Sequence, residues 1–510
     1  MLKSKKSLVM ILSLAMVTSI FAGCSKPAAK VSDTENQPKP VLKALVLYKS
    51  GMDYNNYPVQ KYLEEKTGYK VQYDTLPQDN PMDKLNIIIA SGQEYDFITI
   101  NDKSAYSNYA QQGALTDVEA LIKQYGPNIA KNNATETLNA VRVNGKLDCV
   151  PAQSASGMKN TTNIGSGILV RQDWLTKLGI KTPTTLTEFT DMLQQFKDKD
   201  PNGNGSKNIP FTVDQGLDLL SNGVGGAFGI PTQWKDVSGK LVPRVEMDGF
   251  KDYILYLKEL YAKGLIDKEA PTNQGSTTKE KFTSGRAGCF IDGWYDIPTL
   301  MDTFKKTQPN AKIAYLPPFS GTGDNKAALV GNDLKTSIDQ VTMIPKSSKH
   351  AKDVIKYMNA QLEENTFKEM VIGKENVTYT VKDGGYYPIL PAFFDQRGNA
   401  NQYLTSVTKS YGQYWLARVR KDDRLYEAWK EVNTDVASSI IVEPISSAPI
   451  LPTKAKSDPA LTKLTSDFVL KSVVGDFSDA TLKTFLTQWK TQGGDAVVKE
   501  VNDWYSKSKK

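Results

Sequence analysis

Short apolar blocks separated by polar stretches of helical spacing dominate the chain between residues 41 and 100. The apolar blocks predict strands at 41–48 (VLKALVLY), 69–76 (YKVQYDTL) and 95–100 (YDFITI). The stretches between them, 57–68 and 80–92, predict helices, and each ends in a glycine, as helix C-termini often do. This β-α-β-α-β series predicts a mostly parallel sheet with helices on its faces.

A second series of alternating elements begins after Gly167. The sequence predicts a strand at 168–170, a helix at 171–179 and a second helix at 186–200 capped by Thr187. Further strands are predicted at 287–294, 312–319 and 340–345, and the pattern turns helical beyond about residue 380. We therefore expect two α/β lobes. Three tryptophans are expected in their cores: Trp174, Trp429 and Trp489.

The first 23 residues have the pattern of a secretory signal peptide: a lysine-rich start, about sixteen apolar residues, and small residues before Cys24. The apolar run is short for a membrane span, which needs about 20 residues. Small residues directly before a cysteine resemble the bacterial lipobox, which implies that Cys24 carries a diacylglyceryl lipid. An ordinary cleaved signal with a spare thiol at Cys24 is the alternative. Residues 24–40 then form the lipid anchor and a polar, flexible spacer.

Composition excludes several classes of function. Among 510 residues, 63 Lys and Arg are interspersed with 56 Asp and Glu, so no clustered basic face indicates a nucleic-acid partner. His350 is the only histidine, which nearly excludes histidine-dependent triads and zinc clusters. Cys149 and Cys289 both lie in apolar surroundings; two buried free thiols are favoured over a disulfide.

Four segments carry a resemblance to a known family: 167–205, 282–294, 343–359 and 373–389. They resemble, in the same order, segments of the extracellular solute-binding proteins of bacterial ABC importers, in the lipoprotein branch associated with oligosaccharide uptake. The resemblance implies a two-lobed periplasmic-binding-protein-like fold (type II), with mixed and parallel sheets flanked by helices, joined by hinge strands, and with the ligand in the cleft between the lobes. It also implies that closure on the ligand is what the permease recognises.

Two discontinuous lobes follow from this expectation. We expect the N-terminal lobe to contain residues 41–165 and about 320–375, and the C-terminal lobe to contain residues 166–319 and about 376–510.

A sugar offers a face of C–H groups and a rim of hydroxyls, so aromatic rings and polar side chains near strand ends are candidates for its site. Trp294 and Tyr295 follow an apolar strand, and the family places an aromatic near the cleft there; core or hinge packing is the alternative for Trp294. Trp234 lies in a predicted Gly-rich loop, with surface packing as the alternative. Three more candidates follow predicted strands: Asp102, which a helix cap would also explain, Tyr106 and Tyr48.

The segment DPNGNG suggests calcium, because Asp200, Asn202 and Asn204 alternate as in the first half of a calcium loop. Lys207 and Asn208 stand where related importers carry acids, and this should weaken binding. A calcium-free turn is the alternative. No cofactor is expected to be required, and any calcium would be structural.

The favoured function is that of a substrate-binding lipoprotein which captures an oligosaccharide and delivers it to an ABC permease, without catalysis. Its partners would be the sugar, the permease subunits and, through its lipid, the outer face of the bacterial cell membrane; a monomer is expected. The competing classes are a glycoside hydrolase using Asp292 and Asp296, and a surface sensor or adhesin.

Overall fold

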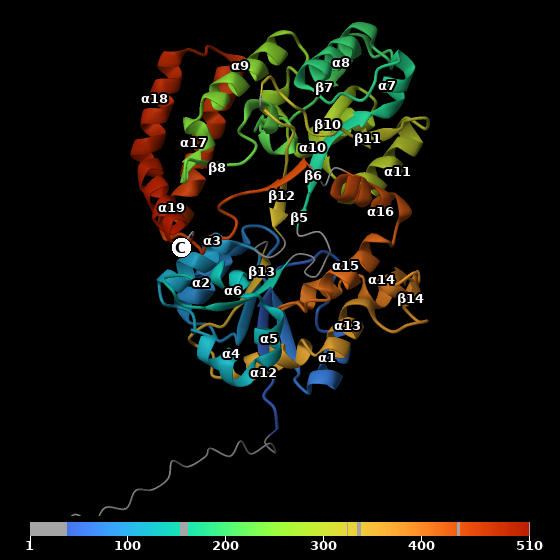
Figure 1. Ribbon diagram of the computed structural model, residues 1–510. Coiled ribbons are helices and arrows are strands. Elements are labelled where there is room, and N and C mark those ends of the chain that lie inside the picture. The colour runs from blue at the N-terminus through green and yellow to red at the C-terminus, as the bar shows by residue number, and fades with distance from the viewer. Residues whose placement is uncertain (1–37, 154–161, 324, 334–337, 436–438, 509–510) are drawn as a thin grey trace, which may run out of the picture. The chain divides into compact units, whose positions relative to one another are not determined.

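The computed structural model describes residues 38–508, except 154–161, 324, 334–337 and 436–438. Cys24 and the signal peptide lie outside the described residues. Residues 40–510 form one unit by their contacts. Within it, two sheets each carry their own helices, and we call these parts the first and second lobe (Figure 1).

The first lobe is built on a five-stranded sheet of order β2-β1-β3-β13-β4, in which β1 runs parallel to β2 and β3, and β13 runs antiparallel to β3 and β4. Its strands are β1 (Leu42–Val46), β2 (Val71–Thr75), β3 (Phe97–Ile100), β4 (Cys149–Gln153) and β13 (Ile338–Met343). The helices are α1 (Pro58–Thr67), α2 (Pro81–Ser91), α3 (Lys103–Gln111), α4 (Glu119–Tyr125), α5 (Pro127–Asn132), α6 (Thr135–Asn139), α12 (Ala351–Gln361), α13 (Glu364–Ile372), α14 (Ala392–Arg397) and α15 (Tyr411–Val419), with the hairpin β14 (Tyr379–Lys382) and β15 (Gly385–Pro388).

The second lobe is built on a four-stranded sheet of order β11-β6-β10-β7. Its strands are β6 (Ser166–Arg171), β7 (Ile209–Phe211), β10 (Ala287–Gly293) and β11 (Ile313–Tyr315), with the hairpin β8 (Trp234–Val237) and β9 (Lys240–Pro243). The helices are α7 (Gln172–Leu178), α8 (Leu186–Lys199), α9 (Asp248–Ala262), α10 (Gly275–Thr283), α11 (Ile297–Thr307), α16 (Asp423–Lys430), α17 (Pro452–Val474), α18 (Asp479–Trp489) and α19 (Asp495–Ser508).

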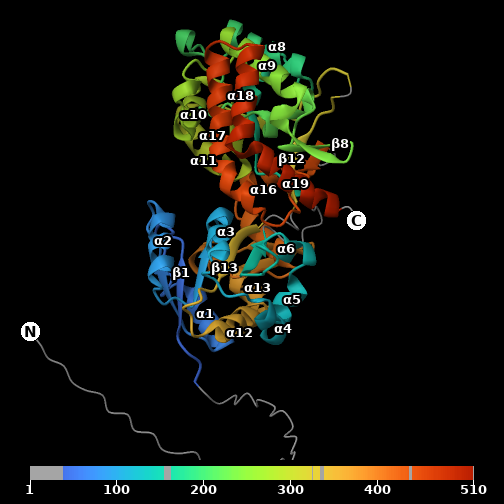
Figure 2. The same ribbon diagram turned by 90° about the vertical axis from the view of Figure 1, so that its left-hand side faces the viewer.

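A small third sheet lies between the two lobes in both ribbon views (Figures 1 and 2). Its strands are β5 (Thr162–Asn163), β12 (Leu329–Asp333) and β16 (Ile440–Val442). The strand β12 pairs antiparallel with β5 and parallel with β16. Because β5 and β12 lie on the segments that pass from one lobe to the other, this junction is where a hinge is expected.

The elements predicted between residues 41 and 100 are all present, and their ends follow local chemistry. Gly68 and Gly92 end α1 and α2 in the left-handed conformation, with φ of 70° and 65°, which glycine adopts without strain. The cap of α8 differs from the prediction: Thr185, not Thr187, accepts from the backbone N–H of Glu188, whose carboxylate accepts from the backbone N–H of Thr185 in return. This reciprocal capping box satisfies two otherwise free N–H groups, which explains the choice of start.

Hydrophobic clusters show which segments belong to which lobe. One cluster fills the first lobe, and two others lie in the second lobe and at the junction. The first cluster includes Tyr379, Phe393, Tyr403 and Tyr414, so the expectation that all residues after about 376 belong to the second lobe is wrong for this stretch. These residues pack their rings onto the helices of the first lobe, and the chain leaves it only after α15.

Cys149 and Cys289 are free and fully buried in different clusters, as the favoured interpretation of the sequence predicted. Burial raises the pKa of the Cys149 thiol to about 12, so the thiol stays protonated at neutral pH. Among the described residues, no helix combines the length and apolar character that a membrane crossing requires.

Candidate functional site

Two aromatic residues of opposite exposure follow strand β10 at the junction side of the second lobe. Trp294 is only 7% exposed, and its Nε1–H donates to the backbone carbonyl of Ile164 at 3.1 Å. Tyr295 is 58% exposed and meets Trp294 nearly edge to face, with ring centroids 5.7 Å apart. At this turn the ring open to a ligand is therefore that of Tyr295, and the packing alternative fits Trp294.

Trp234 opens strand β8 instead of lying in a Gly-rich loop, and it is 5% exposed within the second-lobe core. Its indole lines a cavity of about 280 Å³ between the β8–β9 hairpin and α17, which Arg244 and Lys454 also line. Any ligand contact of Trp234 would have to come from inside this cavity.

The first-lobe candidates take three different positions. Asp102 caps α3, because its Oδ1 accepts from the backbone N–H of Ala105 at 2.9 Å. Tyr106 is fully buried and donates its hydroxyl to the carbonyl of Val141 at 2.7 Å, so the ligand-contact prediction for Tyr106 does not fit its position. Tyr48, just beyond β1, is 43% exposed and can meet a ligand.

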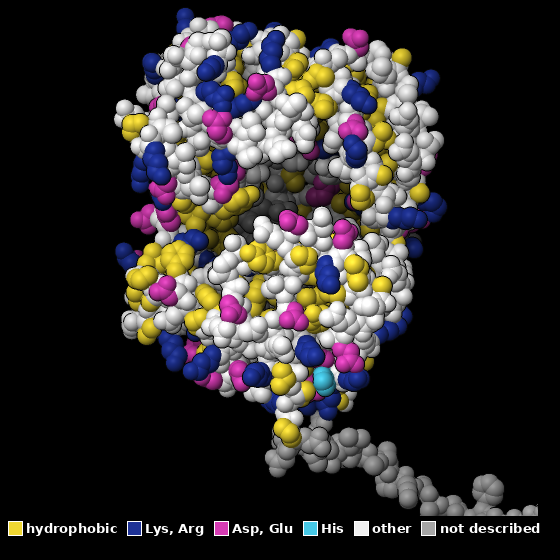
Figure 3. Space-filling view, turned by 180° about the vertical axis from the view of Figure 1, so that it is seen from behind, with side chains coloured by type: hydrophobic (Ala, Val, Ile, Leu, Met, Phe, Trp, Pro, Cys, Tyr) yellow, Lys and Arg dark blue, Asp and Glu magenta, His cyan; other side chains and the backbone are white. Residues whose placement is uncertain are grey.

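A cavity of about 490 Å³ opens at the ends of β7 and β10, close to Tyr295 in sequence and in the fold. This volume is in the range of natural small-molecule sites. We call it the acidic pocket, and its polar lining residues are Thr212, Asp214, Asp218, Asn222, Ser276, Thr278, Lys279 and Asp292. Figure 3 shows a hollow between the two lobes with acidic side chains on its walls.

The carboxyl group of Asp292 lies largely buried in the wall of the acidic pocket. Its side chain is 12% exposed, its Oδ1 accepts from the backbone N–H of Gly293 at 2.8 Å, and its Oδ2 lies 3.4 Å from Lys279 Nζ. Lys279 lies closer to Asp296, at 2.6 Å, so one ammonium group serves two carboxylates. Burial, together with the neighbouring charge of Asp296, raises the pKa of Asp292 to about 6.

Asp218 joins the acidic pocket to the cavity of Trp234, since it lines both. It binds Arg244, with Nη2 and Oδ2 2.9 Å apart, while the buried Nη1 of Arg244 makes no hydrogen bond among the described residues. A third cavity, of about 300 Å³, shares the lining residues Lys454 and Asp458 with the cavity of Trp234. It is also lined by Lys103 of α3 in the first lobe. The three adjoining cavities would suit a ligand of several units.

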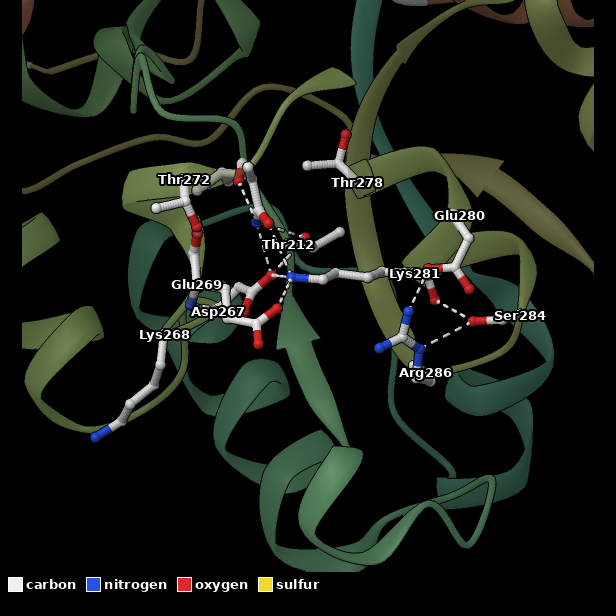
Figure 4. Close-up of polar contacts among 12 residues, drawn as sticks. Thr212, Asp267, Lys268, Glu269, Thr272, Thr278, Glu280, Lys281, Ser284 and Arg286 are labelled. Carbon is white, nitrogen blue, oxygen red and sulfur yellow. Dashed lines mark hydrogen bonds and ion pairs between the residues drawn. The ribbon is translucent and has the colours of Figure 1, made fainter. Parts of the chain in front are cut away.

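A buried ion network holds one wall of the acidic pocket in place (Figure 4). Lys281, whose side chain is 2% exposed, donates to Asp267 at 2.8 Å, to Glu269 at 2.6 Å and to Asn273 at 2.8 Å, so each ammonium hydrogen has an acceptor. Asp267 also accepts from Thr212 at the end of β7. Burial opposes ionisation of Asp267, but these hydrogen bonds outweigh it and lower its pKa.

The Asp200 loop is closed by its own hydrogen bonds. The carboxylate of Asp200 accepts from the backbone N–H groups of Asn204 and Gly205, at 2.9 and 2.6 Å. The side-chain amides of Asn202 and Asn204 both donate to the carbonyl of Gly285. Calcium takes six to eight oxygen ligands, and among the described residues no group of three or more His, Cys, Asp or Glu side chains could hold a metal. With one carboxylate, already bound to two backbone N–H groups, the loop supplies little negative charge for calcium, and the calcium site stays a prediction.

Sequence reasoning missed most of the acidic pocket. Asp214 and Asp218 lie in the segment VDQGLDLL and Lys279 lies in the charged segment TTKEKF, and neither segment has a pattern that marks a binding site. What brings them together is the pairing of β7 with β10 across an intervening hairpin and two helices. The one residue that the sequence did indicate was Asp292, an acid at the end of a predicted apolar strand. It was considered there only as a catalytic partner of Asp296 in a hydrolase.

Comparison with known proteins gives a consistent result. The family model described as "Bacterial extracellular solute-binding protein" matches residues 49–361. The polygalacturonan/rhamnogalacturonan-binding protein YtcQ of Bacillus subtilis is 24% identical, over 98% of this chain and 99% of its own length.

Solved structures have the same two-lobed fold. The substrate-binding protein FusA of Streptococcus pneumoniae in complex with kestose is 19% identical with a TM-score of 0.70, and covers 92% of this chain and 99% of its own. The alginate-binding protein AlgQ2 without calcium ion is 20% identical with a TM-score of 0.69, over 92% and 99%. These likenesses confirm the predicted fold class.

Proposed function

Because the chain belongs to the bacterial extracellular solute-binding protein family, we propose that it is the substrate-binding lipoprotein of an ABC importer and captures an oligosaccharide between its lobes. Cys24 would carry the lipid that tethers the mature chain to the outer face of the membrane. The permease would take the ligand from the closed form.

The observation that carries this proposal is the joint placement of Tyr295 and the acidic pocket at one edge of the second-lobe sheet. An exposed ring can stack on the C–H face of a sugar, while carboxylates, hydroxyls and an amide around a cavity can hydrogen-bond its hydroxyl rim. The names of YtcQ and FusA, which refer to saccharides, agree with this choice of ligand.

Asp292 and Asp296 do not favour the hydrolase alternative. Both share the ammonium group of Lys279, at 3.4 and 2.6 Å, whereas a glycosidase needs two carboxyl groups facing opposite sides of a bound glycosidic bond.

A thermal-shift and calorimetric screen with neutral and acidic oligosaccharides tests the proposal. A ligand at 100 times its Kd should stabilise the protein by about 2.7 kcal/mol, and chromatography should recover that ligand intact. Absence of any stabilising saccharide would refute oligosaccharide capture, and cleaved sugar would support the hydrolase. For the anchor, mass spectrometry of the mature N-terminus should find an acylated Cys24, and a Cys24→Ala variant should appear in the medium.

A further inference from the structure

We propose that the saccharide unit held in the acidic pocket carries no carboxylate, so that this chain selects neutral oligosaccharides over polyuronates. The inference rests on the proposed function and specifies its ligand class. Polygalacturonan and alginate, which appear in the names of two similar proteins, are polyuronates, so it would separate this chain from both.

The charges around the pocket give the first reason. Among the residues that the structure describes, the pocket is lined by three carboxylates, those of Asp214, Asp218 and Asp292, and by one cation, Lys279. That ammonium group is already shared by Asp292 and Asp296, and the carboxylate of Asp218 is bound by Arg244. Since Lys279 is already shared and the lining carboxylates outnumber it, a further carboxylate in the pocket would meet net repulsion at close range.

Unused hydrogen-bonding capacity gives the second reason. Asp292 Oδ2 is buried and accepts no hydrogen bond among the described residues, although Lys279 lies 3.4 Å away. A buried acceptor without a donor is unfavourable, so a ligand that supplies a donor gains affinity there. A sugar hydroxyl can donate to this oxygen, whereas an ionised carboxylate has no hydrogen to donate.

The wall of the pocket has no second lysine ready to pair with the carboxylate of a uronate among the described residues of α10. Lys281, the other lysine on α10, already donates its three ammonium hydrogens inside the wall, to Asp267, Glu269 and Asn273 (Figure 4). Releasing it would leave Asp267 buried and uncompensated, which is strongly unfavourable.

The test uses a matched pair of ligands. The tightest neutral oligosaccharide from the screen is compared, by titration calorimetry, with the same oligosaccharide after oxidation of its primary alcohols to carboxylates. We expect the oxidised form to bind at least thirtyfold more weakly, and this gap to narrow as salt screens the repulsion.

Variants locate the effect. The double variant Asp214→Asn, Asp218→Asn should bind the oxidised form at least tenfold more tightly than the wild type does. Each substitution removes a negative charge, and Asp218→Asn also releases Arg244 from its ion pair. The control is Asp252→Asn, an exposed position on α9 outside the pocket, which should change neither affinity. Melting temperatures verify that the variants are folded.

The outcomes separate the two proposals. If the oxidised form binds as tightly as the neutral one, or if a polyuronate is the best ligand of the screen, the charge inference is overturned while oligosaccharide capture stands. If no saccharide of either kind binds, the proposed function fails and this inference fails with it.

Discussion

The indole of Trp415 on α15 meets the indole of Trp294 edge to face, with ring centroids 5.7 Å apart and planes at 86°. Trp415 packs against both the first-lobe cluster and the junction cluster, whereas Trp294 belongs to the junction cluster. This pair therefore joins the helices of the first lobe to the turn that presents Tyr295.

Trp294→Ala should destabilise the ligand-free protein. Removing a buried indole leaves a cavity, and such changes cost about 3–5 kcal/mol. Denaturant unfolding without ligand measures the loss. A ligand-free variant as stable as the wild type would instead favour the ligand-plate prediction made from the sequence.

Tyr295→Ala should weaken ligand binding and leave the stability of the ligand-free protein almost unchanged. The ring is 58% exposed, so unfolding should change little, while affinity for the saccharide should fall by roughly ten- to a hundredfold as stacking is lost. Tyr125→Ala, which removes a partly buried ring from α4 of the first lobe, is the aromatic control (Figure 1). Equal affinity in both variants would remove Tyr295 from the site.

Lys281→Met should lower the free energy of unfolding by about 3–5 kcal/mol, because it leaves the carboxylate of Asp267 buried without its partner. Lys305→Met removes a lysine that is 72% exposed and should stay within about 0.5 kcal/mol of the wild type. Urea titrations of the two variants give the comparison. Similar values for both would show that the network contributes nothing.

Stability should depend on pH through Asp292. Its pKa of about 6 in the folded state lies above the usual value of 3.8, so the folded protein binds more protons than the unfolded chain between these values. Its contribution is therefore present at low pH and is lost as pH rises from about 4 to about 6. Asp292→Asn should flatten this part of the stability profile, measured by urea unfolding at several pH values. NMR titration of the carboxyl carbon of Asp292 should show a midpoint near pH 6, and a midpoint near 4 would contradict this environment.

A calcium chelator should leave the melting temperature nearly unchanged, because Asp200 is the only carboxylate of its loop and already binds two backbone N–H groups. Scanning calorimetry with and without added calcium measures this. A rise of several degrees with calcium, absent in Asp200→Ala, would restore the structural metal predicted from the sequence.

Structural features that depend only on residues adjacent in the sequence, such as helix C-termini, were predictable. Gly68 and Gly92 end their helices where the pattern placed them, because a left-handed C-terminus is a local property. The cap of α8 was predicted at Thr187, which lies inside the helix, because the pattern does not show the reciprocal bond between Thr185 and Glu188 that sets the start.

The site was less predictable because it depends on distant pairings. Trp294 is buried by contacts with Trp415 and with the backbone carbonyl of Ile164. Both are distant in the sequence, so the residues around Trp294 do not predict these contacts. Asp218 and Arg244 are 26 positions apart, and their ion pair arises only once the β8–β9 hairpin has folded back.

The central position of β13 has a consequence for biogenesis. This strand lies between β3 and β4, yet 184 residues, which form most of the second lobe, separate the end of β4 from its start. A nascent chain that ends at about residue 330 therefore lacks the strand that joins the two halves of its first sheet. The sheet of the first lobe can therefore be completed only after most of the second lobe has been synthesised.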